Sequence, residues 1–182
     1  MTTFSRLQQV KRRFFAMRNG VIADTYRRAG SPFRIIFGLN LPQIVEIAGD
    51  FGPDAGLAEA LWANTSTRES MLLAPMLLRP EDLTEENALK MIEECPSAET
   101  VDILCHRLLR KTPFAFSLAM KAAEAGRSPL TRYAALRLLW HQLLSHPVEC
   151  RRIANDELKR NEPLTSQPAR QIIDELDFMA GE

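Results

Sequence analysis

The stretch VDILCHRLLRKTP, residues 101–113, places one carboxylate beside an apolar helical stripe. The carboxylate of Asp102 could stabilise a positive charge that develops in a transition state, which is a strong contribution to catalysis. It could also be the polar edge of a packed helix, because Asp102, His106 and Arg110 follow one another at i,i+4 spacing and would pair weakly along that edge. Spacing alone leaves both interpretations open. The stretch also carries a group of basic side chains: Arg107, Arg110 and Lys111.

Other reactive groups lack the spacing that their chemistry needs. The three histidines form no HExxH or other metal-ligand pattern, and the three cysteines form no CxxC pair. The sequence also contains no glycine-rich phosphate loop and no GxSxG nucleophile motif. We therefore expect no metal site, no cofactor and no nucleotide-binding function.

Charge is distributed unevenly along the 182 residues, although the formal net charge is zero. Residues 1–34 carry eight Lys and Arg against one acidic residue, residues 35–104 carry three against thirteen, and residues 105–182 carry twelve against nine. The basic first segment, with Arg12 and Arg13, could contact phosphates, or it could be the solvated face of two amphipathic helices.

The sequence predicts neither a membrane span nor a secretory signal. The longest nearly unbroken apolar run covers residues 71–78 and contains a proline, whereas a transmembrane helix needs about 20 apolar residues. The first residues lack the apolar block and cleavage site of a signal peptide. We expect a cytoplasmic protein.

Helical signals cover almost the whole chain. Ser128-Pro129 provides a side-chain cap followed by a proline at the first helical position, and Ser66 with Glu69 forms a potential capping box. Residues 68–74 weakly resemble residues 132–138 in sequence. This internal similarity favours stacked helix pairs, that is, an α-solenoid. Helices are expected near residues 3–18, 20–29, 41–51, 54–63, 67–79, 84–95, 98–111, 113–125, 129–145, 147–160 and 166–179.

Four stretches occur in an order that resembles the AlkD-like family of HEAT-repeat DNA alkylation repair proteins. They are FGLNLPQ at 37–43, LAEALWANTSTRESMLL at 57–73, TVD at 100–102 and PLTRYAAL at 129–136. The resemblance implies an all-α, armadillo-type fold: a HEAT-like α-solenoid of stacked antiparallel helix pairs. We expect a single domain over 1–182, comprising basic N-terminal helices (1–34), a family-like core (35–145) and C-terminal helices (146–182).

The resemblance also implies roles for individual residues. Asp102 matches the catalytic carboxylate that stabilises the cationic sugar as an alkylated purine departs, and Arg132 matches an arginine near the DNA backbone. Asn40 stands where the family often has glutamine. We expect Arg68, Asp102, Arg107 and Arg132 near one concave face. The residues expected to bind duplex DNA are Arg132, Asn40, Arg68, Arg107, Arg110, Lys111, Arg12 and Arg13.

Two departures from the family pattern bear on activity. The family has a tryptophan one helical turn before the carboxylate and another in the last helix, and this chain has Ala98 and Glu175 there. These changes argue against efficient excision. Two hypotheses follow: a DNA-binding protein that excises N3- or N7-alkylated purines weakly or not at all, or a non-catalytic HEAT-repeat module whose acidic middle binds a protein partner.

Overall fold

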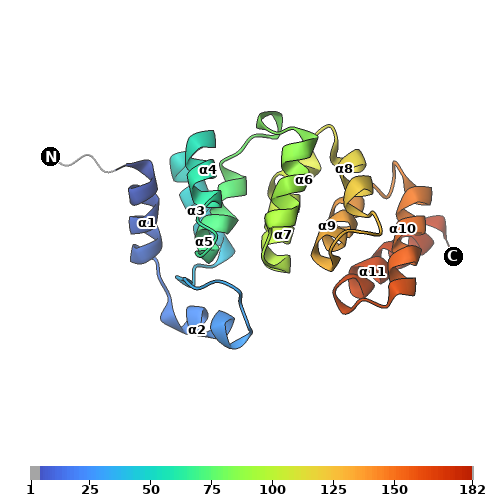
Figure 1. Cartoon of the computed structure of the whole chain (residues 1–182), viewed down its shortest axis with the longest axis horizontal. Helices are drawn as coiled ribbons and strands as arrows, with labels where there is room; N and C mark the ends of the chain where they lie inside the picture. Colours follow the sequence, from blue (N-terminus) through green and yellow to red (C-terminus); the bar gives the residue numbers. More distant parts are fainter. Residues whose placement is uncertain (1–4, 182) are drawn as a thin grey trace. The chain divides into compact units, whose positions relative to one another are not determined.

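The computed structural model describes residues 5–181, and all of its regular elements in that range are helical (Figure 1). The prediction of an all-α protein is confirmed. An isolated parallel bridge joins Ile35 to Thr67. The α-helices are α1 (Arg6–Ala16), α2 (Gly20–Arg28), α3 (Leu41–Phe51), α4 (Ala55–Trp62), α5 (Arg68–Leu73), α6 (Glu85–Glu94), α7 (Ala98–Arg107), α8 (Ala115–Ala122), α9 (Pro129–Leu139), α10 (Pro147–Arg160) and α11 (Pro163–Ala180).

Local capping explains where several helices begin. Ser128 accepts a hydrogen bond from the backbone of Thr131 at the start of α9, as predicted, and Ser97 does the same for Thr100 in α7. The last predicted helix begins earlier than expected, because Pro163 occupies its first turn.

The largest differences from the predicted bounds are two helices that each end six residues early. The helix expected over residues 67–79 gives way after Leu73 to the 3-10 turn Ala74–Met76, which contains Pro75. The helix expected over residues 129–145 ends at Leu139. The apolar periodicity of the sequence continues past Leu73 and Leu139, but the chain does not continue as an α-helix there.

The described helices fall into two compact units, one up to residue 82 and one from residue 83. In the first unit α5 packs against α3 and α4, and α1 packs against α4. The core includes Phe14, Leu39 and Ile44, which are fully buried. None of the described helices has the length and apolarity required to cross a bilayer.

A buried glutamate organises the loop before α3. Glu69 accepts hydrogen bonds from the backbone N–H groups of Phe37 (3.0 Å), Gly38 (3.0 Å) and Leu39 (3.3 Å). Arg68 donates to the carboxylate of Glu69 at 3.0 Å. Desolvated charges persist in a core only when they are paired and hydrogen-bonded in this way.

The predicted capping box is therefore wrong. Thr67, not Ser66, precedes the first residue of α5, and it makes no side-chain cap hydrogen bond. Glu69 satisfies three donors of a distant loop instead of the donor at the start of its own helix. The loop outcompetes the local cap because its N–H groups are buried and would otherwise lack an acceptor.

Gly38 lies where the same loop approaches α2. Its φ is +81°, and an added Cβ would lie 2.1 Å from the carbonyl oxygen of Asn19. A side chain at this position would meet both a steric and a conformational barrier.

In the second unit the helices form two sets, and within each set one helix packs on the next. α7 packs on α9 and α9 on α11, while α6 packs on α8. The sets are also joined to each other, since α8 packs on α9 and α10 on α11 (Figure 1). The side chains of α9 that point into this packing include Ala134, Ala135 and Leu138, all fully buried.

The two tryptophans differ in exposure. Trp62 is partly buried and packs against a cluster of Ala23, Phe33, Ile36 and Met71. Trp140 follows the last residue of α9 and is 38% exposed, so it does not belong to the buried core. The helix ends before it, which takes the indole out of the buried stripe.

Candidate active site

Asp102 is held by two side chains of the neighbouring helix. Tyr133 donates its hydroxyl to both carboxylate oxygens, at 2.9 and 3.0 Å. Arg137 pairs through its Nε with one of these oxygens at 2.7 Å. Tyr133 and Arg137 are four residues apart on α9, so they lie on one face of that helix. Because α9 packs on α7, this face meets the side of α7 that carries Asp102.

The carboxylate borders a cavity of about 390 Å³. Asp102 and Arg137 each retain 37% of their side-chain exposure, so a ligand in the cavity could reach the carboxylate. The opposite wall comes from the first turns of α11, including Gln167 and Gln171. The full lining is Asp102, Tyr133, Arg137, Pro163, Leu164, Gln167, Pro168 and Gln171.

Pro168 interrupts the hydrogen-bond pattern of the helix that forms this wall. A proline has no backbone N–H, so Pro168 cannot make the helical hydrogen bond to the carbonyl of Leu164. Both residues line the cavity. The carboxylate of Asp102 and the two amide side chains in the lining suit a ligand that is positively charged or donates hydrogen bonds.

Tyr133 stays protonated over the physiological pH range. Desolvation, together with the negative charge of Asp102 and the hydrogen bond to it, raises the pKa of Tyr133 to about 12. The phenol therefore acts as a fixed donor that orients the carboxylate. The second donor to the Asp102 carboxylate, Arg137, balances its negative charge.

The alternative interpretation of Asp102 as a partner of His106 is not what the structure displays. The carboxylate contacts Tyr133 and Arg137 across the interhelical interface. The pKa of His106 is lowered by desolvation and then by the positive charge of Arg110. Asp102 therefore binds side chains of α9 rather than His106, because α9 packs on the side of α7 to which the carboxylate points.

Three of the predicted DNA-binding residues form a basic cluster beyond His106: Arg107, Arg110 and Lys111. None of them forms an ion pair within residues 5–181, and the Nε atoms of Arg107 and Arg110 are buried without a hydrogen-bond partner there. Their positive charge, together with that of Arg137, lowers the pKa of His106. The cluster therefore belongs to the same cationic surroundings as Arg137, the partner of Asp102.

Arg132, expected at the DNA backbone, lies in the core of the second unit. Only 7% of it is exposed, and its Nε donates to Glu157 at 2.9 Å. Glu157 is itself 2% exposed and also binds Arg160 and Thr165. A guanidinium in this position neutralises a buried carboxylate, and a phosphate would have to displace that carboxylate to reach it.

Arg68 is buried in the same way in the first unit. It is 2% exposed, and besides Glu69 it donates to the hydroxyl of Tyr26 at 2.8 Å. The internal similarity between residues 68–74 and 132–138 therefore corresponds to two buried arginine–glutamate pairs, Arg68 with Glu69 and Arg132 with Glu157. Both arginines are engaged by the core and present no surface to a ligand.

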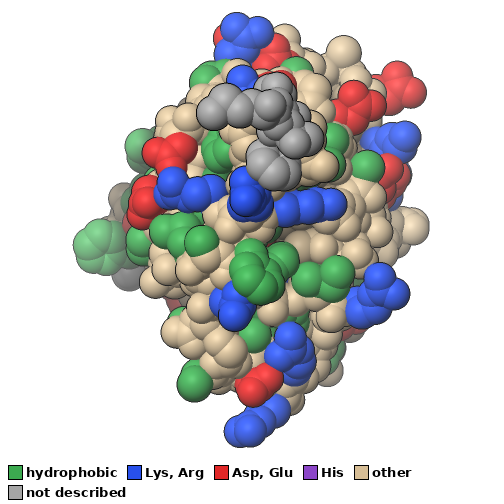
Figure 2. Space-filling view, turned by 90° about the vertical axis from the view of Figure 1, so that its left-hand side faces the viewer, with side chains coloured by type: hydrophobic (Ala, Val, Ile, Leu, Met, Phe, Trp, Pro, Cys, Tyr) green, Lys and Arg blue, Asp and Glu red, His purple; other side chains and the backbone are tan. Residues whose placement is uncertain are grey.

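The remaining predicted contacts belong to the first unit. Asn40 caps α3 through a reciprocal pair of hydrogen bonds with Gln43, both 3.0 Å. Arg13 pairs with Glu46 and Asp50, each at 2.9 Å. Arg12, which lies beside Arg13 on α1, is exposed. Figure 2 views the side of the first unit where α1 lies, and it shows Lys and Arg side chains gathered there with hydrophobic side chains among them.

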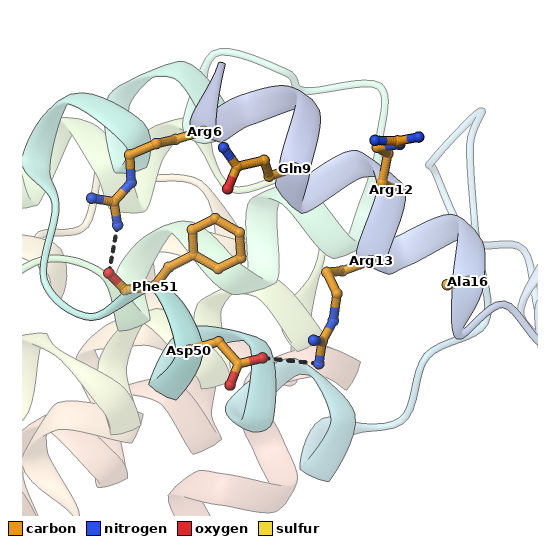
Figure 3. A pocket seen from close by; sticks show the side chains of 7 residues that line it. All are labelled: Arg6, Gln9, Arg12, Arg13, Ala16, Asp50 and Phe51. Carbon is orange, nitrogen blue, oxygen red and sulfur yellow. Dashed lines mark hydrogen bonds and ion pairs between the residues drawn. The ribbon is translucent and has the colours of Figure 1, made fainter. Parts of the chain in front are cut away.

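A groove of about 800 Å³ runs between α1 and the end of α3. Arg6 and Arg13 extend to either side of the Phe51 ring, and Arg12 points away from it (Figure 3). Arg6 also pairs with Asp54 at 3.0 Å. The cations in this groove are largely neutralised by carboxylates.

The two departures from the family pattern lie close to the Asp102 site but do not line it. Ala98 is the first residue of α7, one turn before Asp102. Glu175 is on α11, while the residues of that helix that line the cavity include Gln167 and Gln171. No tryptophan borders the cavity.

Sequence reasoning missed Tyr133 and Arg137. Their i,i+4 spacing marked one polar face of a helix whose other positions from Thr131 to Leu139 are buried, and that signal could have identified them. It could not have named their partner, which lies more than 30 residues earlier in the chain.

A family model described as DNA alkylation repair enzyme matches residues 10–167. The matched region contains Asp102, Tyr133 and Arg137. No curated protein and no solved structure matches the chain.

Proposed function

The chain belongs to the DNA alkylation repair enzyme family, and on this premise we propose that it binds alkylated duplex DNA and acts on it at the Asp102 cavity. The proposed reaction is hydrolysis of the N-glycosidic bond of N3- or N7-alkylpurines, which releases the modified base. Because the family's tryptophans are absent from this cavity, we expect excision to be slow.

The observation that carries the proposal is the Asp102 carboxylate at the edge of a cavity, oriented by Tyr133 and Arg137. An alkylated purine is a cationic leaving group, and its departure moves positive charge onto the sugar. A fixed carboxylate stabilises that charge more in the transition state than in the ground state, which is the requirement for catalysis. The same oxygens can position the attacking water.

The basic cluster of Arg107, Arg110 and Lys111 supports DNA binding beside this cavity. Side chains without carboxylate partners in the described range can neutralise phosphates at little cost, whereas paired ones must first break an ion pair. Arg137 would share its guanidinium between Asp102 and a phosphate. Buried Arg68 and Arg132 are left out of the proposed contact surface.

A HEAT-like α-solenoid remains part of the proposal. In the second unit α7, α9 and α11 pack one on the next, and α6 packs on α8, which is the stacking expected of repeated helix pairs. We propose that residues 1–182 form one such domain.

The test measures release of 3-methyladenine and 7-methylguanine from methylated duplex DNA. Wild-type protein is compared with Asp102→Asn, which keeps the size of the side chain but removes its charge. We expect release by the wild type and a loss of at least tenfold in the variant. Asp174→Asn, an exposed carboxamide variant on α11, serves as the matched control and should behave as wild type.

Each outcome has a defined meaning. Equal release by wild type and Asp102→Asn would remove Asp102 from the chemistry. No release by either would leave only the binding role, which a salt titration with duplex DNA then decides. Absence of binding at low salt would exclude phosphate contacts altogether.

The second candidate function is a non-catalytic protein-interaction module, and one observation favours it. A groove of about 420 Å³ between α10 and α11 is lined partly by Pro147, Val148, Leu176 and Ala180. Val148 is 75% exposed and Phe178, on α11, is 80% exposed. Apolar side chains presented in this way are typical of protein contact surfaces.

A further inference from the structure

One face of α1 is distinct from both the Asp102 cavity and the groove beside Phe51. Lys11 and Phe15 follow one another at i,i+4 on α1, Arg18 lies just after the end of this helix, and all three are exposed. The Phe15 ring retains 59% exposure. Arg18 lies over this ring, with its guanidinium carbon 3.9 Å from the ring centroid, and donates to the Phe15 carbonyl at 3.3 Å.

This face is strongly positive. Helix α1 contains no acidic residue, and Lys11 and Arg18 form no ion pair within the part of the chain that the structure describes. By contrast, Arg6 and Arg13 on the opposite side of α1 are paired with carboxylates of the first unit. Figure 2 shows hydrophobic side chains between Lys and Arg side chains on the side of the first unit where α1 lies.

We propose that the Lys11–Phe15–Arg18 face binds single-stranded nucleic acid. An unpaired base stacks on the side of the Phe15 ring that Arg18 leaves open, while Lys11 and Arg18 contact the neighbouring phosphates. Stacking on an exposed aromatic ring within a basic surface is how sequence-tolerant single-strand binding works. The cation over the other face of the ring strengthens this platform.

Two alternatives fit the residues less well. A duplex offers phosphates but no free base face, so it would leave the Phe15 ring exposed. An anionic membrane needs a helix that can turn a broad apolar face to the lipid. Of the large apolar residues of α1, Val10 and Phe14 are already buried in the first unit, and Phe15 alone does not make a broad face.

The experiment uses the full chain and a fluorescent oligothymidine of about 16 nucleotides, near the upper site size of such surfaces. Replacing Phe15 by Ala should weaken binding by about 5- to 150-fold, which corresponds to the loss of one stacked base. Lys11→Gln should lower the slope of log K against log salt by about 0.7. Phe178→Ala removes a phenylalanine of α11 that is even more exposed than Phe15, 80% against 59%, and should leave oligothymidine affinity unchanged.

Binding of blunt duplex DNA is measured in parallel, and it tests the Asp102 region independently. Duplex affinity that is retained in Phe15→Ala, together with lost oligothymidine affinity, supports the proposal. Unchanged oligothymidine affinity in Phe15→Ala overturns it while the proposed repair function stands. Wild-type protein that binds phosphatidylserine vesicles but no oligothymidine also overturns it and identifies the face as a lipid contact.

Discussion

Arg132 and Arg137 lie five residues apart on α9, and the structure predicts opposite consequences when each is replaced by methionine. Arg132→Met removes one partner of a buried ion pair. Breaking such a pair costs about 3–5 kcal/mol. The lower end applies here, because Glu157 keeps Arg160 at 3.1 Å and Thr165 at 2.9 Å. We expect a loss of about 3 kcal/mol in the free energy of unfolding.

Arg137→Met should behave differently. Its pair with Asp102 is 37% exposed on both sides, so the loss in stability should be about 0–1 kcal/mol. Asp102 keeps both hydrogen bonds from Tyr133. If Arg137 contacts a phosphate, its loss should reduce the salt slope of duplex binding by about 0.9.

Urea titrations followed by far-UV circular dichroism measure the first effect, and salt titrations with duplex DNA measure the second. For a chain of this size we expect the melting temperature of Arg132→Met to fall by about 6–12 °C, with an unchanged salt slope once the variant is folded. Wild-type stability combined with weakened DNA binding in Arg132→Met would refute the assignment of Arg132 to the core.

Three further predictions concern the loop before α3 and the Asp102 site. Gly38→Ala should lower the free energy of unfolding by at least about 3 kcal/mol in a urea titration, because its Cβ meets a backbone oxygen. Gly30→Ala, with a similar φ of +80° but open space around it, should lose only about 1–2 kcal/mol. Glu69→Ala should lose about 3–5 kcal/mol by the same assay, since it leaves a buried arginine and three N–H groups without their acceptor. The raised pKa of Tyr133, about 12 against 10.0, means that the folded state keeps a proton that the unfolded chain loses. Stability should therefore fall as pH rises from about 10 to 12, and absorbance titration of the phenolate should give a lower pKa for Tyr133 in Asp102→Asn.

Those features of the fold that depend on neighbours in the sequence could be predicted. The cap at Ser128 and the prolines at the starts of α9, α10 and α11 act within one helical turn. The periodicity of buried positions likewise needs only the helix itself. These local rules predicted an all-helical chain and most helix positions, and a resemblance carried by four short stretches predicted the family.

The candidate site could be predicted only in part. The sequence and the family resemblance selected Asp102 and the basic cluster after it, because a carboxylate beside cations is visible within one helix. Neither of them identified Tyr133 and Arg137, since these meet Asp102 only where α9 packs on α7. The same limitation explains the expectations for Glu69, whose donors come from a loop about 30 residues away, and for Arg68, whose partner Tyr26 lies on α2.

The sequence by itself determined the helices, their apolar faces and the presence of Asp102 among basic residues. Only the tertiary structure decided which arginine of α9 neutralises a buried glutamate and which one reaches the candidate active site. The reason is physical: helical periodicity fixes the direction of a side chain about its own axis, but its partner, and so its desolvation and charge, depends on the element that packs there.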